Sequence, residues 1–421
     1  MAIDTPARIA VLGAGPVGLE AALYARYLGY DVDLYERGDV ADNVLRWGHV
    51  RLFTPWRNNV SPLGVAALRI QDDAWRPPAA DAILTGREFF EIYLQPLAHS
   101  DLLIDSLRKQ TEVVAVGRED QLKGDHVGEE VREDGDFRLL LRDRNGNESI
   151  ASADAVIDAT GTYGNHNWAG ASGIPAPGEI AAADAIEYGL PDVFGRDRVR
   201  YAGKTTLVAG AGYSAATSVV ALNELAREAA ETKIIWTVRR TPPAGVGPIA
   251  EIKDDRLGER DQLARAANAL AMGGSPAIEF LAGRMIDRIE RTEAGRLAVR
   301  LTGPSAPTVE VDRIIANVGY RPDNRIYAEL QVHECYASNG PMELATAIMA
   351  NRSADCLDQV AHGPASLANP EPDFYILGAK SYGRNSQFLL SVAYEQIREL
   401  FSVLGDRADL DLYRTVGRLA E

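Results

Sequence analysis

The sequence has few cysteines, no long apolar run and no cluster of basic residues. Its two cysteines, Cys335 and Cys356, form no CxxC pair and belong to no Cys/His ligand set. A disulfide framework, a structural zinc site and a dithiol redox centre are therefore all disfavoured. No apolar stretch approaches the ~20 residues that a bilayer-spanning helix needs. None of the six histidines has metal-ligand spacing to another, and we expect no metal site.

Acidic residues outnumber basic ones in this chain. The 421 residues include 60 Asp and Glu against 44 Lys and Arg, which gives a formal net charge of −16. Nucleic acids and anionic membranes are bound through clustered Lys and Arg, so we expect neither as a partner. The N-terminus shows no signal-peptide pattern, and we expect a cytoplasmic protein. The length predicts two or three globular domains.

A glycine-rich turn near the N-terminus gives the strongest signal. The apolar run 8–12 is typical of a buried parallel strand, and it leads into Gly-Ala-Gly-Pro-Val-Gly at 13–18. A helical stretch follows and ends at Gly29, and a second strand, 31–35, ends at Glu36. This is a βαβ unit with the dinucleotide-binding fingerprint in its expected context. Its backbone N–H groups would approach a pyrophosphate, and the carboxylate of Glu36 would bind ribose hydroxyls.

The same plan recurs in the second half of the chain. A strand at 206–209 runs into Gly-Ala-Gly-Tyr-Ser-Ala at 210–215, and a helix and a further strand, 233–238, follow. Arg239 and Arg240 stand where the first unit has its acidic residue. Paired guanidinium groups fit a 2′-phosphate, so this site predicts NADPH rather than NADH. The alternative is that both arginines are solvated charges at the end of a strand.

Each βαβ unit is followed by a strand meander and then by an apolar strand that ends in glycine. These last strands cover 155–161 and 313–319. The repeat predicts an α/β fold with two Rossmann-like dinucleotide-binding domains, the second inserted into the first. We place the first part of the FAD-binding domain at 1–195, the NADPH-binding domain at 196–312, and the second part of the FAD-binding domain at 313–421.

This arrangement resembles the flavoproteins with two dinucleotide-binding domains, a group that contains flavin-containing monooxygenases, Baeyer–Villiger enzymes, N-hydroxylases and thioredoxin reductase-like proteins. The resemblance covers nearly the whole chain. It rests on both fingerprints, on Ala159-Thr160-Gly161 and on Asn-Val-Gly-Tyr-Arg-Pro-Asp at 317–323. It implies FAD on the first domain, held by Gly13, Gly15, Pro16, Gly18, Glu36, Arg37, Val114 (beside the adenine), Thr160 and Gly161. It implies NADPH on the second, held by Gly210, Gly212, Tyr213, Ser214, Ala215, Arg239 and Arg240.

Within this group the likeness is closer to the monooxygenases. The segment 47–59, followed by Thr-Gly-Arg-Glu-Phe-Phe-Glu-Ile-Tyr-Leu at 85–94, is similar to their flavin-covering loop and the helix after it. Three features depart from the group. The motif FxGxxxHxxx(F/W) is absent from 162–200, and the Gly-Asp that holds the flavin ribityl chain in disulfide reductases is replaced at 378–380 by Gly-Ala-Lys. A loop position that often holds Asn reads Thr-Pro-Trp at 54–56.

Candidate groups around a flavin ring come from two segments. His49 and Arg51 are candidate catalytic residues, and Arg51 would stabilise an anionic flavin. Asn385 is a third candidate, because it precedes a helix predicted at 387–401 whose N-terminus would point at the flavin pyrimidine edge. The same segments supply further predicted cofactor contacts: Arg46, Trp47, Trp56, Lys380, Ser386, Gln387 and Phe388. The alternatives are a packed crossover loop and plain helix capping.

The predicted function is an FAD-dependent, NADPH-consuming monooxygenase. It would insert one oxygen atom from O2 into a small heteroatom- or carbonyl-bearing molecule, while the protein excludes water and positions the substrate. Two alternatives stay open. One is an NAD(P)H-dependent flavin reductase that passes electrons to a quinone, a ferredoxin or a protein acceptor, and the other is a non-catalytic sensor that binds both nucleotides. The resemblance also suggests a homodimer.

Overall fold

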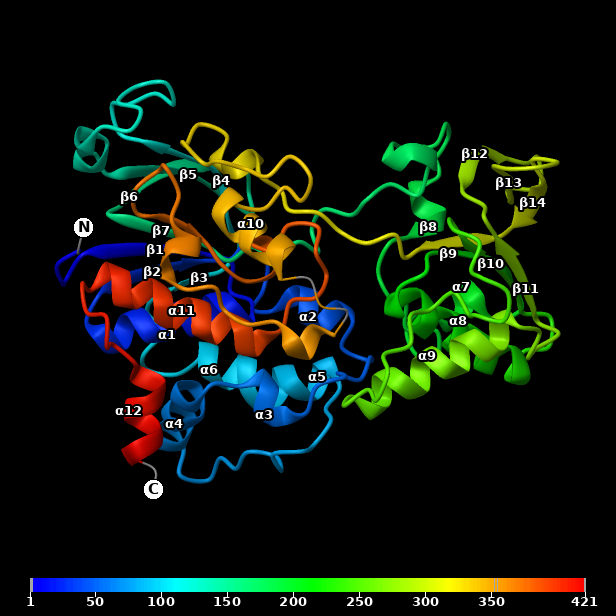
Figure 1. Cartoon of the computed structure of the whole chain (residues 1–421), viewed down its shortest axis with the longest axis horizontal. Coiled ribbons are helices and arrows are strands. Elements are labelled where there is room, and N and C mark those ends of the chain that lie inside the picture. The colour runs from blue at the N-terminus through cyan, green and yellow to red at the C-terminus, as the bar shows by residue number, and fades with distance from the viewer. Residues whose placement is uncertain (1–2, 352, 354, 420–421) are drawn as a thin grey trace. The chain divides into compact units, whose positions relative to one another are not determined.

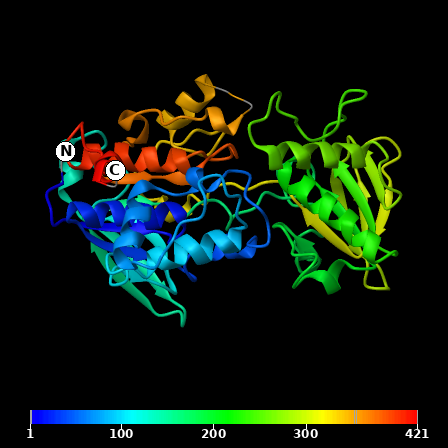
Figure 2. The same cartoon turned by 90° about the horizontal axis from the view of Figure 1, so that it is seen from below.

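The computed structural model describes residues 3–351, 353 and 355–419, and the chain folds into two compact units. The second unit spans His166–Tyr320, and the first is built from the chain before and after it (Figures 1 and 2). One unit is thus inserted into the other, as the repeated fingerprint predicts. The second unit extends beyond both ends of 196–312, so the assignment of nucleotide-binding domains to 1–195, 196–312 and 313–421 stays a prediction.

A five-stranded parallel sheet in the order β16-β7-β1-β2-β3 forms the centre of the first unit. Its strands are β1 (Arg8–Leu12), β2 (Asp31–Tyr35), β3 (Leu107–Arg108), β7 (Ala155–Asp158) and β16 (Phe374–Ile376). Side chains alternate between the two faces of a strand. Ile9 and Val11 of β1 therefore pack among helices, while Ala10 and Leu12 pack against a second sheet. Burial on both faces explains why β1, β7 and β16 read as nearly continuous apolar runs.

The second sheet is antiparallel, in the order β4-β5-β6, and it covers one face of the parallel sheet. Helices α1 (Pro16–Leu28) and α11 (Leu390–Leu404) cover the other face. The antiparallel strands are β4 (Thr111–Arg118), β5 (Phe137–Asp143) and β6 (Glu148–Ala153). The other helical segments of this unit are α2 (Asp42–Arg46), α3 (Trp56–Asn59), α4 (Pro62–Gln71), α5 (Gly86–Phe89), η1 (Phe90–Leu94), α6 (Gln95–Ala98), η2 (Glu130–Asp134), η5 (Arg325–Tyr327), α10 (Met342–Ala350), η6 (Cys356–Asp358), η7 (Pro364–Leu367), η8 (Gly378–Lys380) and α12 (Leu412–Leu419).

The helix that corresponds to 85–94 is not a regular α-helix. It consists of α5, a π-helical turn (η1) and α6. Pro96 lacks the N–H that would donate to the carbonyl of Ile92, and the indole Nε1 of Trp75 donates to that carbonyl instead, at 2.9 Å. The loss of one backbone hydrogen bond at this point accompanies the π-helical turn.

The second unit has a parallel sheet of its own, in the order β11-β10-β9-β15-β8. Its strands are β8 (Ile186–Glu187), β9 (Thr205–Ala209), β10 (Lys233–Val238), β11 (Ile278–Ala282) and β15 (Arg313–Ala316). One face packs on α8 (Tyr213–Glu228) and α9 (Gly258–Ala271), and the other packs on the meander β12 (Ile286–Arg291), β13 (Leu297–Leu301) and β14 (Thr308–Val311). The shorter segments are η3 (Ala171–Gly173), η4 (Ala183–Ala185) and α7 (Arg198–Tyr201). The predicted α/β class with two parallel-sheet units is confirmed.

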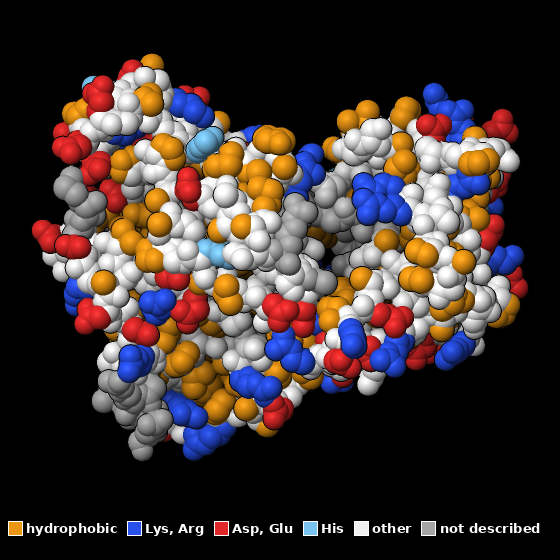
Figure 3. Space-filling view, viewed as in Figure 1, with side chains coloured by type: hydrophobic (Ala, Val, Ile, Leu, Met, Phe, Trp, Pro, Cys, Tyr) orange, Lys and Arg blue, Asp and Glu red, His pale blue; other side chains and the backbone are white. Residues whose placement is uncertain are grey.

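The surface of each unit carries charges of both signs. Figure 3 shows acidic and basic side chains interspersed over the face in view. Among the helices that the structure describes, none has both the length and the apolar character needed to cross a membrane. The described residues also include no group of three or more His, Cys, Asp or Glu side chains that could hold a metal ion.

Candidate nucleotide-binding sites

The first glycine turn follows β1 and opens α1. Gly13 has φ +94°, in the left-handed region that glycine adopts without a Cβ penalty, and its N–H donates to the carbonyl of Tyr35 at 2.7 Å. A Cβ on Gly18 would lie 1.8 Å from the carbonyl oxygen of Gly13, so only glycine allows the helix to approach the turn this closely. Gly15 is the N-cap of α1 and Pro16 stands in the first turn, with no side chain capping the end. The free N–H groups of this end suit a phosphate.

Glu36, at the end of β2, is fixed beside this turn. Its Oε2 accepts from the N–H of Ala14 at 2.9 Å, and its Oε1 accepts from the N–H of Gly38 at 2.8 Å. The N–H of Thr111 donates to the Glu36 carbonyl at 2.9 Å, which brings the start of β4 next to the turn. Val114 on β4 lies at a bulge, where the pairing with β5 shifts between Val113 and Ala115, and its backbone is thus out of the regular ladder.

A second turn, after β7, lies against the first. A Cβ on Gly13 would lie 3.0 Å from the carbonyl oxygen of Ala159 and 3.1 Å from the Cα of Thr160. Gly161 completes this turn with φ +68°. The guanidinium of Arg37 reaches Gly164, where a Cβ would meet its Nη2 at 2.6 Å. The structure therefore brings together predicted residues from four separate stretches of the first unit: the glycine turn, Glu36-Arg37, Val114 and Thr160-Gly161.

The predicted flavin-covering loop pairs with the start of α5. The N–H of Gly86 donates to the carbonyl of Val50 at 2.9 Å, and the ring of Trp47 fills the space that a Cβ on Gly86 would need, 2.5 Å away. The indole Nε1 of Trp47 is buried, and no hydrogen-bond acceptor faces it in the part of the chain that the structure describes. His49 and Arg51 are exposed on this loop. The indole N–H of Trp47 is therefore fixed in position, and none of the described residues accepts a hydrogen bond from it.

Arg46, the residue before this loop, is also exposed. Its Nη2 lies 2.9 Å from Oδ2 of Asp42, one turn earlier in α2. The pair lies at the protein surface, where an ion pair of this kind contributes little to stability.

Two residues predicted to contact the cofactor are buried in the structure. Trp56 is 4% exposed and packs edge-to-face on Tyr93, with ring centroids 5.7 Å apart, as part of the apolar core. Lys380 is 1% exposed, and its Nζ lies 2.5 Å from Oδ2 of Asp158. Direct contacts of these two residues with a cofactor stay predictions.

The segment before α11 also differs from its prediction. The helix begins at Leu390 rather than 387, because its N-cap, Leu389, has extended backbone angles. Asn385 is not the cap: its Oδ1 accepts from the N–H of Gln387 at 3.0 Å and closes a short turn. Ser386 is exposed, and Phe388 packs edge-to-face on Tyr382 at 5.3 Å. The cofactor contacts predicted for residues 385–388 stay predictions.

The glycine turn of the second unit follows β9 and opens α8. Gly210 has φ +147°, and a Cβ there would lie 2.3 Å from the carbonyl oxygen of Asn317. Gly212 is the N-cap of α8, with no side-chain cap, and the hydroxyl of Tyr213 donates to the carbonyl of Ala250 at 3.0 Å. Ser214 at this end is exposed, whereas Ala215 is buried. The two units thus build the same contact between a glycine turn and the chain after a parallel strand.

Arg239 and Arg240 follow β10, and both side chains are exposed. Since β10 pairs in parallel with β9, the carboxyl ends of these strands lie at one edge of the sheet, with the glycine turn. Asn317, the first residue of the motif at 317–323, for which no cofactor contact was predicted, also lies at this edge. It accepts from the hydroxyl of Ser218 at 2.8 Å and donates to the carbonyl of Gly189 at 2.8 Å.

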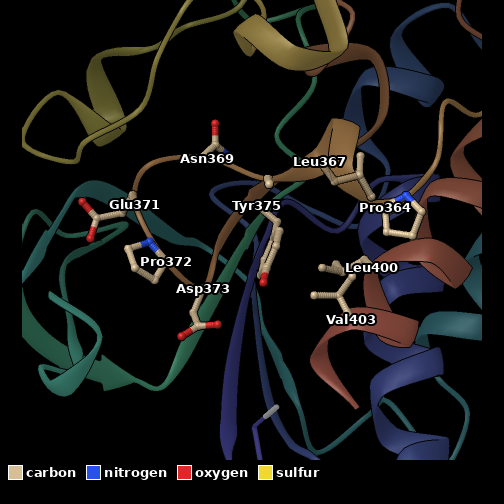
Figure 4. Close-up of a pocket in the computed structure, with 10 residues that line it drawn as sticks. Pro364, Leu367, Asn369, Glu371, Pro372, Asp373, Tyr375, Leu400 and Val403 are labelled. Carbon is tan, nitrogen blue, oxygen red and sulfur yellow. The ribbon is translucent and has the colours of Figure 1, made fainter. Parts of the chain in front are cut away.

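A small cavity elsewhere in the first unit is not part of these sites. It measures about 80 Å³ and includes Asp373 and Tyr375 in its lining (Figure 4). Burial raises the pKa of Asp373. Asp373 precedes β16, at the amino end of a strand, whereas the nucleotide turns lie at the carboxyl ends. The volume is also far below that of a dinucleotide pocket.

Comparison with known proteins gives matches among solved structures alone. No protein-family model and no curated protein matches the chain. A bacillithiol disulfide reductase from Bacillus cereus matches with 16% identity over 95% of this chain and 99% of that chain, with a TM-score of 0.67. The FAD-bound cadaverine monooxygenase of desferrioxamine biosynthesis from Erwinia amylovora matches with 12% identity over 96% and 95%, with a TM-score of 0.63.

A third match is an ornithine N-hydroxylase from a Kutzneria species, solved with reduced FAD, NADP⁺ and L-ornithine. It has 15% identity over 96% of this chain and 100% of that chain, with a TM-score of 0.59. Thioredoxin reductases are among the further matches. The predicted resemblance is thus confirmed at the level of the fold, and this chain has the fold that these reductases and monooxygenases share.

Proposed function

We propose that this protein is an FAD-containing, NADPH-dependent oxidoreductase. The observation that carries the proposal is the pair of glycine turns, each opening an uncapped helix at the carboxyl edge of a parallel sheet. The first turn stands beside the fixed carboxylate of Glu36, which suits the free ribose diol of FAD. The second stands at the same edge as Arg239 and Arg240, which suit the 2′-phosphate of NADPH.

The residues of the first unit fit FAD. The α1 N-terminus would face the pyrophosphate, Val114 would lie beside the adenine, and the unpaired indole N–H of Trp47 would gain an acceptor. FAD, when bound, supplies the electron transfer and oxygen chemistry. The chain's own task is then to bind, to orient and to exclude water, for which no strong acid or base is required.

We further propose that the reaction is monooxygenation of a small molecule. The fold shared with the cadaverine monooxygenase and the ornithine N-hydroxylase supports this proposal. The sequence supports it too, because it has no CxxC pair for a dithiol relay. The second candidate is a flavin reductase. It is favoured by the fold shared with the disulfide reductase and by the missing monooxygenase motif in 162–200.

The test follows electrons and oxygen in the purified full-length protein. NADPH is added without air to the flavin-loaded protein, and the oxidised-flavin absorbance should bleach. Oxygen is then admitted with a panel of amines, thioethers and ketones. A monooxygenase forms one oxygenated product for each NADPH and each O2 consumed. A reductase consumes NADPH with a quinone or ferredoxin and forms no oxygenated product. Absence of FAD binding would overturn both candidates.

A further inference from the structure

Lys380 and Asp158 form a buried ion pair in the first unit, beneath the predicted FAD site. The Lys380 side chain is 1% exposed and that of Asp158 is 0% exposed, and Nζ lies 2.5 Å from Oδ2. Asp158 ends β7 and Lys380 ends η8, just after β16, which pairs with β7. Two charges taken out of water in this way need close mutual pairing, and each also needs its remaining hydrogen bonds satisfied.

Thr160 is hydrogen-bonded to both partners and connects the pair to the surface. Oδ1 of Asp158 accepts from the hydroxyl of Thr160 at 2.6 Å and from its N–H at 3.1 Å. The hydroxyl oxygen of Thr160 accepts from Nζ of Lys380 at 3.1 Å. Thr160 itself is exposed, and its Cα lies 3.1 Å from where a Cβ on Gly13 would stand. A chain of direct contacts therefore runs from the buried pair to the glycine turn.

The charges of Asp158 and Lys380 affect how strongly an anionic ligand binds at the glycine turn. The pyrophosphate of FAD carries negative charge. Asp158 directly precedes Ala159 and Thr160, whose backbone lies against Gly13. A buried carboxylate is poorly screened, so it would repel the pyrophosphate unless a cation neutralises it. Lys380 is the cation that faces it, with the ring of Tyr327 5.1 Å from Nζ on its other side.

We propose that Lys380 is a positioning residue for FAD, which it serves without touching the cofactor. It neutralises Asp158 and holds the Thr160 turn against the glycine turn, so that the pyrophosphate meets no net negative charge. This inference rests on the proposed FAD site. Lys380 belongs to the Gly-Ala-Lys segment that replaces the Gly-Asp of the disulfide reductases. The role proposed here is indirect, whereas the sequence predicts a direct contact between Lys380 and the cofactor.

The two partners should have opposite effects on affinity for FAD. Lys380→Met leaves the Asp158 charge uncompensated near the pyrophosphate, and we expect FAD binding to weaken about tenfold or more. Asp158→Asn keeps an oxygen acceptor for Thr160 and leaves the lysine charge in place. FAD binding should then be as tight as in the wild type, or tighter. A pair that acts through fold stability alone would give losses of the same sign in both variants.

The experiment measures the dissociation constant of FAD by fluorescence titration of the flavin-free full-length protein, with no turnover involved. Near-UV circular dichroism and thermal unfolding report whether each variant is folded. The double variant Asp158→Asn/Lys380→Met replaces both charges by neutral side chains of similar volume, so the inference predicts that it binds FAD about as tightly as the wild type. Lys380→Met is the variant most at risk of misfolding, and this second comparison does not depend on it.

The outcomes separate the inference from the proposed function. A weaker Lys380→Met whose affinity returns to about the wild-type value when Asp158→Asn is added supports the inference, and a double variant that binds FAD about tenfold less tightly than the wild type would overturn it. Equal losses in both single variants, or no change in any variant while the wild type binds FAD, would overturn it and leave the proposed function standing. A wild type that binds no FAD would overturn the proposed function first, and the inference with it.

Discussion

At the residue scale, we propose that Arg239 and Arg240 select the nicotinamide cofactor of the second unit. Both follow β10 and are exposed, at the edge of the sheet where the glycine turn opens α8. If they bind a 2′-phosphate, replacing both by alanine removes two charge-assisted contacts, each stabilising by about 1.5–3 kcal/mol. We expect the double variant to raise the KM for NADPH at least tenfold and to change the KM for NADH about twofold or less. Steady-state kinetics with both cofactors measures this.

The control for this prediction is an arginine of the same unit away from the turn. Arg265 on α9 is exposed and pairs with Asp261, one helical turn earlier, at 2.9 Å. Arg265→Ala should leave the KM for both cofactors unchanged. Equal losses for NADPH and NADH in the double variant would mean that the two arginines are solvated charges, without a role in selecting the cofactor.

Helix α1 illustrates the element scale, because it buries a carboxyl group among other elements. Glu20 is 1% exposed, and burial raises its pKa to about 7, an effect only partly offset by the hydroxyl groups of Ser61, Tyr413 and Tyr93. These hydroxyls come from the N-cap of α4, from α12 and from η1. Tyr413 also packs edge-to-face on Tyr24 of α1, with ring centroids 5.3 Å apart. The protonated acid thus lies where α12 docks on α1.

The raised pKa predicts that the packing of α1 is more stable in acid. In the unfolded chain Glu20 ionises around its ordinary pKa of 4.5, whereas in the folded chain its pKa of about 7 keeps it protonated to about pH 7. Stability is therefore lost as pH rises from about 4.5 to 7, by up to about 3 kcal/mol. Glu20→Gln has no proton to lose. It should abolish this pH dependence, as measured by hydrogen exchange of the α1 amides at pH 5.5 and pH 8.

Glu395 on α11 provides a matched control, because its side chain is 51% exposed and pairs with Arg398 at 2.9 Å. Glu395→Gln should keep the wild-type difference between the two pH values. Glu399 contributes in the same direction, since burial raises its pKa as well, and this contribution cancels when the wild type is compared with Glu20→Gln. Retention of the full pH difference in Glu20→Gln would show that the buried acid is not its source.

Individual helices, strands and turns differ in how well the sequence predicts them. The glycine turns and their flanking strands were predictable, because a turn that needs φ near +94° and a buried strand both depend on a few adjacent residues. The ion pair of Asp158 and Lys380 was not predictable, since the partners are 222 residues apart and only the pairing of β7 with β16 brings them together. The packing of Trp56 on Tyr93 was not predictable for a similar reason. An aromatic residue in a polar loop reads as a ligand contact until its packing partner, Tyr93, is known.

The boundaries between the two units were also not predictable from the sequence. Composition gives no sharp boundary at 166 or 320, and the segment 332–370, which carries α10, showed no readable pattern. Local periodicity thus identifies elements, but the docking of one element on another depends on contacts that are distant in sequence.

At the scale of the whole molecule, the second unit has what an independent domain needs. Its two apolar cores consist entirely of residues between Ala169 and Val318. Its ends meet, because the N–H of Asn167 donates to the carbonyl of Gly319 at 2.9 Å and His166 forms a bridge with Tyr320. A domain whose termini are adjacent can be inserted into another domain without disturbing either one.

We therefore expect residues 166–320, produced alone, to fold. The fragment should unfold in a single cooperative thermal transition and bind NADPH within about threefold of the affinity of the full chain, since the glycine turn and Arg239-Arg240 are all contained in it. It should bind no FAD, because Glu36 and the first turn lie outside it. Calorimetry measures both the unfolding and the binding. Carrying the alanine replacements of Arg239 and Arg240 into the fragment should weaken NADPH binding as in the full chain. A fragment that folds yet ignores NADPH would contradict the assignment of this nucleotide to the second unit.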